Sequence, residues 1–379
     1  MKILLLTDGI TPYNIGGMQN HSYLLTKLLA QNNCKITLVH CGFFNNINFF
    51  EDYADIFSPS EIKNITPVFI PFISNGKIPG HYITESKLYS ENIKKHFGIN
   101  LSKFDLIYAQ GFTGWNFLNN NQNIPVIVNL HGLEMFQKAP SNRVKLEHYI
   151  LKPFVKQIIK KADYLLSFGG QIDNILEVLK VDNAKIIKQS NGIEKNWIKK
   201  TEPLLTKTRT FTFIGRYERR KGIEELTAAL VELIKKDLKF QFNFIGPIPK
   251  KHQITHPKIK YLGEIKDLAT IKQSLDQSDF LVSPSYSEGM PTVILEAMAR
   301  GNAIIATNVG ANSKMIDTNG WLIDCSRTAI IKSILKATNM DNSELLEMKK
   351  QSLMKVKTSF TWENVIKDQL QCFKEIISK

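Results

Sequence analysis

The most informative stretch of this chain reads Ser283-Pro-Ser-Tyr-Ser-Glu-Gly-Met-Pro-Thr-Val-Ile-Leu-Glu-Ala-Met-Ala-Arg-Gly301. An apolar run at residues 279–283 leads into it and predicts a buried strand. Pro291 and Gly301 are residues that favour the first position and the end of a helix. The stretch therefore predicts a strand, a short turn and then a helix.

The turn and the helix place two carboxylates on either side of free backbone N–H groups. Glu288 lies in the turn, and Glu296 lies about 7.5 Å along the helix from Pro291, at ~1.5 Å of rise per residue. The N–H groups of Gly289 and Met290 lie at the positive end of the helix dipole, where phosphate binds favourably. The carboxylates can accept hydrogen bonds from hydroxyls beside that phosphate, so the pattern predicts binding of a nucleoside diphosphate sugar.

Length and composition indicate a globular protein. The 379 residues, 43% of them hydrophobic, suffice for two domains. No apolar run approaches the ~20 residues that span a bilayer. The cysteines show no C-x-x-C spacing, which favours neither a zinc site nor a disulfide framework. We therefore expect a cytoplasmic protein that is at most peripheral on the inner face of the membrane.

The net charge of +14 is concentrated in two segments. Residues 142–161 carry six basic side chains against one acid, and residues 195–221 carry nine against two. Such patches attract phosphates, anionic membranes or nucleic acid. No aromatic-rich RNA motif or helix-turn-helix pattern is present, so nucleic acid is not expected. One stripe of residues 142–161 predicts either a solvated face or contact with a membrane surface; it contains Lys145, Lys152, Lys156 and Lys160.

Short apolar runs alternate with helical patterns along almost the whole chain. They cover residues 2–7, 35–40, 105–109, 126–130, 163–168, 186–189, 211–214, 240–245, 259–262, 279–283 and 303–307. Strands that alternate with helices predict parallel sheets with right-handed crossovers. The charged, aperiodic segment 195–209 predicts a linker. The expected fold class is α/β, with Rossmann-like domains at residues 1–195 and 210–360 that face each other across a cleft.

Glycine and polar landmarks follow six of the predicted strands, at the sheet edge where ligands bind in open α/β folds. Gly16 and Gly17 allow backbone N–H groups to approach a phosphate closely, although a tight βα turn explains them as well. His131 can donate to a sugar hydroxyl or to a developing charge, or it is structural. Asn191-Gly192 lines the cleft or forms a turn.

Two cations flank the start of the second predicted domain. Arg216 ends its first strand and Lys221 opens the next helix, so both can point at a diphosphate in the cleft. Cations there stabilise a leaving nucleoside diphosphate, a task that other enzymes give to a divalent metal. The chain has no Asp-x-Asp pair, so we expect no metal and no cofactor other than the donor itself. Arg219 and Arg220 are expected to face solvent.

Together these motifs resemble those of the retaining glycosyltransferases of family 4, which have the GT-B fold. The resemblance spans nearly the whole chain and is strongest over residues 211–310. It rests on Gly16-Gly17 with His21, His131-Gly132, Gly215-Arg216 with Lys221-Gly222, and Glu288-Gly-Met-Pro with Glu296.

The resemblance implies a role for each of these residues. Arg216 and Lys221 would hold the donor diphosphate. Glu288 and the N–H groups after it would hold hydroxyls of the transferred sugar, and Glu296 would hold the ribose. His131 would lie near the reacting carbon, and Gly17 would approach the phosphate from across the cleft.

The resemblance also implies the chemistry and the partners. Transfer would need no metal and would retain the anomeric configuration by front-face attack. The donor would be a UDP-sugar first and a GDP-sugar second. The acceptor would be a glycan or a lipid-linked glycan of a bacterial envelope polysaccharide. Residues 361–379 would form a helix that packs back on the first domain.

The chain departs from the family pattern at Gly310-Ala311, at Lys314 and in the Met-Gln-Asn segment after Gly17. These departures concern the selection of acceptor and donor sugar. Two alternatives remain open. A GT-B-like nucleotide-sugar epimerase would need an acid/base pair near the second carbon of the sugar. A non-catalytic basic module would bind polyanions or membranes without nucleotide preference.

Overall fold

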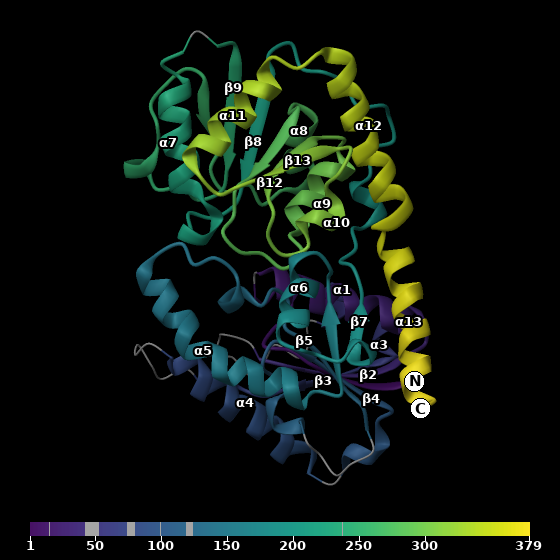
Figure 1. The fold of residues 1–379 in the computed structure, drawn as a ribbon. Helices are drawn as coiled ribbons and strands as arrows, with labels where there is room; N and C mark the ends of the chain where they lie inside the picture. Colours follow the sequence, from purple (N-terminus) through teal and green to yellow (C-terminus); the bar gives the residue numbers. More distant parts are fainter. Residues whose placement is uncertain (15, 42–52, 74–79, 99, 119–123, 237) are drawn as a thin grey trace.

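The computed structural model describes residues 1–14, 16–41, 53–73, 80–98, 100–118, 124–236 and 238–379. They form two α/β domains, each built around a parallel sheet (Figure 1). The expected α/β class with two such sheets is therefore confirmed.

The first domain contains a seven-stranded sheet with the order β3-β2-β1-β4-β5-β6-β7. Its strands are β1 Lys2–Leu6, β2 Lys35–His40, β3 Ile65–Phe69, β4 Leu106–Gln110, β5 Val126–Asn129, β6 Tyr164–Ser167 and β7 Ile186–Lys188. Its helices are α1 Gly17–Gln31, α2 Tyr53–Ile56, α3 Pro59–Ile62, α4 His81–Phe97, α5 Asn142–Lys161 and α6 Gln171–Val178. Side chains alternate between the two faces of the central strand β1, so that Ile3 and Leu5 belong to one core and Leu4 and Leu6 to the other.

The second domain contains a six-stranded sheet with the order β10-β9-β8-β11-β12-β13. Its strands are β8 Arg209–Ile214, β9 Phe240–Ile245, β10 Ile259–Tyr261, β11 Phe280–Ser283, β12 Ala303–Thr307 and β13 Gly320–Ile323. Its helices are α7 Ile223–Leu233, α8 Leu268–Asp276, α9 Thr292–Ala299, α10 Asn312–Met315, α11 Arg327–Thr338 and α12 Asn342–Ser359. Stacked phenylalanines on adjacent strands, such as Phe211 and Phe280 with ring centroids 5.4 Å apart, fill its core.

The C-terminal helix α13, Trp362–Ile377, leaves the second domain and lies along the first (Figure 1). A bridge between Ile193 and Thr361 joins the end of the first domain to the start of this helix. Phe373 then packs in the core of the first domain, with its ring centroid 5.8 Å from that of Tyr108. The two domains are therefore connected twice, once by the linker and once by α13.

A fully buried ion pair ties α12 to the sheet of the second domain. The Nζ of Lys349 lies 3.1 Å from Oδ1 of Asp279 and donates to the carbonyl of Ser278 at 2.9 Å. Asp279 also accepts from the N–H groups of Thr206 and Thr210, at 3.2 and 3.1 Å. The linker segment before β8 is thus fastened to the sheet through the same carboxylate.

The predicted strands match the structure within two residues, but two strands are missing from the prediction. Both β3 and β13 lie at sheet edges. Pro67 interrupts the β-branched pattern of β3, and proline is tolerated there because an edge strand needs fewer ladder hydrogen bonds. The boundaries of α9 also differ: the helix begins at Thr292 with Pro291 as its N-cap, and it ends at Ala299 before Gly301.

None of the helices in the described part of the chain is long and apolar enough to cross a membrane.

Candidate active site

The loop between β11 and α9 touches the first domain backbone to backbone. A Cβ atom at Gly289 would lie 2.0 Å from the carbonyl oxygen of His131, which only a glycine avoids. Gly310, at a φ of 51°, packs from the other side, where a Cβ atom would lie 2.2 Å from the carbonyl oxygen of Gly289. The structure thus brings Gly289 and His131 together, as the predicted site requires.

Glu288 is buried at the centre of a charged cluster. Its Oε1 accepts hydrogen bonds from Nζ of Lys221 at 2.6 Å and from Oγ of Ser285 at 2.7 Å. The guanidinium of Arg220 lies 3.6 Å from the other carboxylate oxygen. Burial alone would raise the pKa of Glu288, but Lys221 and Arg220 outweigh it and hold the pKa below its usual value. The carboxylate is ionised at neutral pH and can accept hydrogen bonds.

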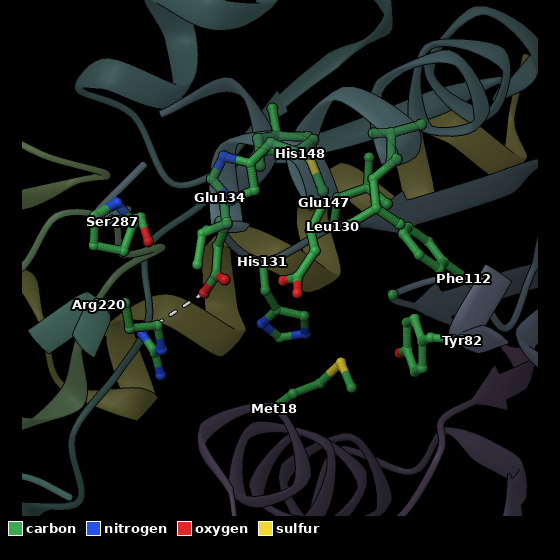
Figure 2. A pocket seen from close by; sticks show the side chains of 18 of the residues that line it. Met18, Tyr82, Phe112, Leu130, His131, Glu134, Glu147, His148, Arg220 and Ser287 are labelled. Carbon is green, nitrogen blue, oxygen red and sulfur yellow. Dashed lines mark ion pairs between the residues drawn. The ribbon is translucent and has the colours of Figure 1, made fainter. Parts of the chain in front are cut away.

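The expectation that Arg219 and Arg220 face solvent is wrong. Arg220 lines the cavity between the domains and forms an ion pair with Glu134 at 3.6 Å (Figure 2). It also lies 3.6 Å from Glu288. Arg219 is held by two hydrogen bonds to Glu225 and lies over the ring of Tyr286. Both belong to the turn Arg219–Lys221. The sequence gives no signal for this placement, because only the path of the turn decides which arginine faces inward.

Arg216 lies outside the charged cluster. Its side chain is 65% exposed and forms an ion pair of 2.9 Å with Glu218. It follows β8 at the sheet edge, as predicted, but no described contact joins it to Glu288 or Lys221. Its contact with the donor diphosphate stays a prediction.

His131 has the left-handed backbone conformation, with a φ of 61°, and its N–H is held by Oδ1 of Asn129 at 3.0 Å. Its Nε2 lies 2.7 Å from Oε1 of Gln110, so the neutral ring donates there and leaves the lone pair of Nδ1 available. Burial, and then the nearby ring of His21, lower the pKa of His131 well below its usual value. The ring is therefore a neutral polar group in the wall of the cavity.

Gly16 and Gly17 lie at the start of α1, and the structure separates their roles. A Cβ atom at Gly16 would lie 2.1 Å from Oε1 of Gln19, so the Gln19 side chain would have to move to admit it. A Cβ atom at Gly17 would meet no described atom within 4 Å. Packing within the chain thus leaves space at Gly17. The approach of its backbone to a phosphate stays a prediction.

Asn191 joins the two domains rather than only lining the cleft. Its Nδ2 donates to the carbonyl of Met290 at 2.9 Å, and its Oδ1 pairs with Nδ1 of His21 at 2.8 Å. Among the hydrogen bonds between described residues, none is donated by the N–H groups of Gly289 and Met290. No described residue therefore accepts a hydrogen bond from these two N–H groups, and their contact with a ligand stays a prediction.

Gln137 is a site residue that the sequence pattern misses. Its Nε2 donates to the carbonyl of Glu288 at 2.7 Å, and its Oε1 accepts from the N–H groups of Glu288 and Gly310 at 3.3 and 3.1 Å. It belongs to the first domain and holds the loop of the second. A single glutamine in an irregular segment carries no recognisable motif, so the sequence could not have indicated it.

Glu296 lies on α9 beyond this loop. Burial raises the pKa of Glu296 to about 7, and a hydrogen bond with Thr292 lowers it only in part. At neutral pH the carboxyl group is therefore partly protonated and can donate as well as accept. The contact of Glu296 with the ribose of the donor stays a prediction.

A cavity of about 610 Å³ opens between the domains beside the charged cluster (Figure 2). The second domain contributes polar groups, among them Arg220 and Ser287. His131 and Glu134 lie where the two walls meet. Most of the first domain's wall is apolar, including Met18, Tyr82, Phe112, Leu130, Leu151 and Val155. Such a cavity suits a ligand with an apolar part next to a charged one.

Within the part of the chain that the structure describes, no three His, Cys, Asp or Glu side chains gather as a metal site would need. Independence from metal is a property of the reaction, and it stays a prediction.

Comparisons with known proteins agree with this geometry. Residues 208–339 match a family model described as glycosyl transferases group 1, and residues 15–197 match one for glycosyltransferase family 4. An uncharacterized glycosyltransferase of Methanocaldococcus jannaschii is 26% identical over 391 residues, covering 99% of each chain. TuaC of Bacillus subtilis, a glycosyltransferase assigned provisionally to teichuronic acid biosynthesis, is 25% identical over 71% of this chain and 70% of its own length.

Solved structures show the same fold. Sucrose-phosphate synthase from Thermosynechococcus elongatus superposes with a TM-score of 0.78 at 18% identity, covering 100% of this chain and 99% of the other. HepE of Anabaena, solved in complex with UDP and glucose, superposes with a TM-score of 0.66 at 15% identity over 100% of both chains. The GT-B arrangement of two Rossmann-like domains is therefore confirmed. The chain belongs to the group 1, family 4 glycosyltransferases.

Proposed function

We propose that this glycosyltransferase moves a hexose-type sugar from a nucleoside diphosphate sugar to a glycan or lipid-linked glycan, without metal and with retention of configuration. The observation that carries the proposal is the ionised Glu288 beside Lys221 and Arg220, at the sheet edge that faces His131. UDP is the first candidate for the nucleotide, supported by HepE, which was solved with UDP and glucose. GDP is the second.

The Lys221–Glu288 pair is suited to exchange its partners when the donor binds. Lys221 and Arg220 would turn toward the diphosphate, joined by Arg216 from the exposed rim. Glu288 would then accept hydrogen bonds from hydroxyls of the transferred sugar. Each charge keeps a partner throughout, so the exchange leaves no charge buried and uncompensated.

Retention would follow from attack on the same face that the leaving group departs from. The bond between the anomeric carbon and the diphosphate oxygen breaks, and the bond to the acceptor oxygen forms on that face. The acceptor proton passes to the departing phosphate oxygen. Lys221 and Arg220 stabilise the negative charge that develops on the diphosphate. The neutral His131 contributes a polar contact near the anomeric carbon.

The cavity and α5 favour an acceptor with a lipid part. On the outer face of α5, Tyr149 is 75% exposed and Leu146 is 61% exposed. Lys145 and Lys156 lie four residues before and seven residues after Tyr149, which places them on the same helix face. Exposed apolar side chains among lysines are suited to an anionic membrane surface. We therefore propose peripheral contact of residues 142–161 with the membrane that carries the acceptor.

Thermal unfolding with nucleotides tests the donor site directly. UDP, GDP, ADP and CMP are added in turn, with and without EDTA, to the wild type and to Lys221→Met. A ligand at ~100 times its Kd adds ~2.7 kcal/mol to the free energy of unfolding. We expect a selective shift with one nucleoside diphosphate that EDTA does not change and that Lys221→Met reduces. No shift with any nucleotide would favour a non-catalytic module that binds polyanions or membranes.

A further inference from the structure

A small second cavity of about 10 Å³ adjoins the large one on the side of the first domain. This volume holds one water-sized group, such as a water molecule or a single hydroxyl. Met18, Tyr82 and Phe112 line both cavities and separate them. The polar lining of the small cavity includes Asp8 and Gln110.

Gln110 presents an unpaired polar atom to this cavity. The residue is 0% exposed, and its Oε1 pairs with Nε2 of His131 at 2.7 Å. Its Nε2 has no hydrogen-bond partner among the residues that the structure describes. A buried donor without a partner is unfavourable, so an acceptor oxygen is expected beside it.

Asp8, which follows β1, provides the complementary group. Its Oδ1 accepts a hydrogen bond from Nε2 of Gln19 at 2.8 Å. No described cation forms an ion pair with the carboxylate, and besides Gln19 its hydrogen-bond donor is its own backbone N–H. Burial raises the pKa of Asp8 to about 6, and the Gln19 hydrogen bond lowers it only in part. Among the described residues, Gln19 is therefore the only side chain that donates to this carboxylate.

We propose that Asp8 and Gln110 form a subsite for one hydroxyl group of the sugar acceptor. The hydroxyl donates to Asp8 and accepts from Nε2 of Gln110. Tyr82 and Phe112, which stand between the two cavities, pack against the apolar part of the same molecule. The proposal rests on the proposed transfer to a glycan, and it adds the residues that select the acceptor.

The ligand class follows from the charges. A phosphate is disfavoured, because Asp8 would repel it and no described cation stands beside the small cavity. A neutral polyol satisfies both groups at once. Gln110 also forms a hydrogen bond with His131, which is predicted to lie near the reacting carbon. The bound hydroxyl and His131 therefore share Gln110 as a hydrogen-bond partner.

Binding of simple amphiphilic sugars tests the subsite. The probes are n-octyl β-D-glucoside, n-octyl β-D-galactoside and n-octyl β-D-mannoside below their micelle concentrations, with n-octyl phosphate as the charged comparison. Isothermal titration calorimetry is performed on the full chain. We expect at least one glycoside to bind more tightly than the phosphate, and Asp8→Asn and Gln110→Glu each to weaken it at least tenfold.

The control is Asp105→Asn. Asp105 lies at the opposite end of the same sheet and accepts from the N–H of Lys2 at 2.7 Å. This variant should bind the glycoside as the wild type does. If Asp8→Asn does not fold, Asp8→Glu keeps the charge, extends the carboxylate into the cavity and should show the same loss.

Three outcomes overturn the subsite: no glycoside binds, the phosphate binds as tightly as the glycosides, or the Asp8 and Gln110 variants bind as the wild type does. The nucleotide-induced thermal shift is measured on the same preparations. A normal shift together with any of these outcomes overturns the subsite and leaves the proposed donor site standing. A missing shift in the wild type counts against the proposed function itself.

Discussion

Two lysine–carboxylate pairs in the second domain have the same chemistry and opposite surroundings. Lys349 and Asp279 are sealed in the core, and the remaining polar atoms of the pair are held by the backbone of Ser278, Thr206 and Thr210. Lys221 and Glu288 lie beside Arg220, which lines the interdomain cavity, and the second carboxylate oxygen of Glu288 lies 3.6 Å from Arg220. The polar atoms of the first pair are occupied by partners in the core, whereas the second pair can exchange its partners for groups of a ligand.

This difference shows why a buried ion pair alone does not mark an active site. A sealed pair holds elements together, and breaking it leaves a charge in the core. A pair at a sheet edge beside a cavity and beside free N–H groups is prepared for a charged ligand. Five predictions test the comparison.

The largest effect is expected for Lys349→Met, which leaves Asp279 buried without its cation. The free energy of unfolding, measured in urea, should fall by ~3–5 kcal/mol. The double variant with Asp279→Asn should recover part of the loss, because no charge then remains in the core. Equal stability of Lys349→Met and the wild type would contradict the structural role of the sealed pair.

Glu288→Gln should lower kcat/KM by ~10²–10³-fold, since the neutral amide accepts weaker hydrogen bonds from the sugar. The melting temperature should change less than in Lys349→Met. Asp276→Asn is the control, because this carboxylate forms an ion pair with Arg300 away from the cavity. Activity close to that of the wild type in Glu288→Gln would remove Glu288 from the site.

His21 is a buried titratable group, and no acidic side chain among the described residues forms an ion pair with it. Burial lowers the pKa of His21 to about 4, so the folded protein resists a proton that the unfolded chain takes up below pH 6.5. Stability should therefore fall between pH 6.5 and 4, by up to ~1.4 kcal/mol per pH unit from this residue. His21→Gln should show a shallower fall in urea unfolding than the exposed control His96→Gln. If the unfolding free energies of the two variants changed with pH in the same way, the lowered pKa of His21 would be contradicted.

Arg216 lies at the exposed rim of the charged cluster, whereas Arg220 lies in its interior, so variants of the two arginines compare these positions. Arg216→Gln should weaken binding of the preferred nucleoside diphosphate about tenfold, because a charge-assisted hydrogen bond contributes ~1.5–3 kcal/mol. Arg220→Gln should weaken it to a similar degree and should also raise the pKa of Glu288, which loses one of its two cations. Isothermal titration calorimetry measures the affinity of both variants for the nucleoside diphosphate. Unchanged affinity in Arg216→Gln would exclude it from the diphosphate site.

The smallest effect concerns the lysine stripe on α5. Each lysine near an anionic membrane contributes ~1 kcal/mol, so Lys156→Gln should reduce binding to phosphatidylglycerol vesicles about fivefold. Lys235→Gln, on the second domain, is the matched control. Co-sedimentation measures the bound fraction. Equal binding of both variants would leave the stripe as a solvated face.

Much of the fold could be predicted because its determinants are local. The buried strand β12 is an almost continuous apolar run, and β9 alternates phenylalanines with Gln241 and Asn243; the predicted bounds of both agree with the structure. The missing strands, β3 and β13, lie at edges where one side lacks a neighbour, so Pro67 is tolerated in β3 and the apolar signal is short. Edge strands take their pairing from the sheet rather than from their own sequence.

The site shows the same division. Glu288 and Lys221 meet in the structure, and both belong to motifs with recognisable spacing. Arg220 and Gln137 carry no motif, yet they contact Glu288 from a turn and from an irregular segment of the other domain. Their contacts depend on how two chain segments about 70 and 150 residues from Glu288 are brought together.

By itself the sequence determined the two parallel sheets, the strand–turn–helix around Glu288 and the position of the candidate residues at the sheet edges. These follow from hydrophobic periodicity and from the conformations of glycine and proline, which act over a few residues. Only the tertiary structure decided that Lys221 pairs with Glu288 while Lys349 pairs with Asp279 and that Arg220 faces inward. It also decided that Nε2 of Gln110 lacks a described partner and that Gln110 and Asp8 line the same small cavity. The physical reason is that charge pairing and burial depend on distances between segments far apart in the chain, which the packing of the two domains establishes.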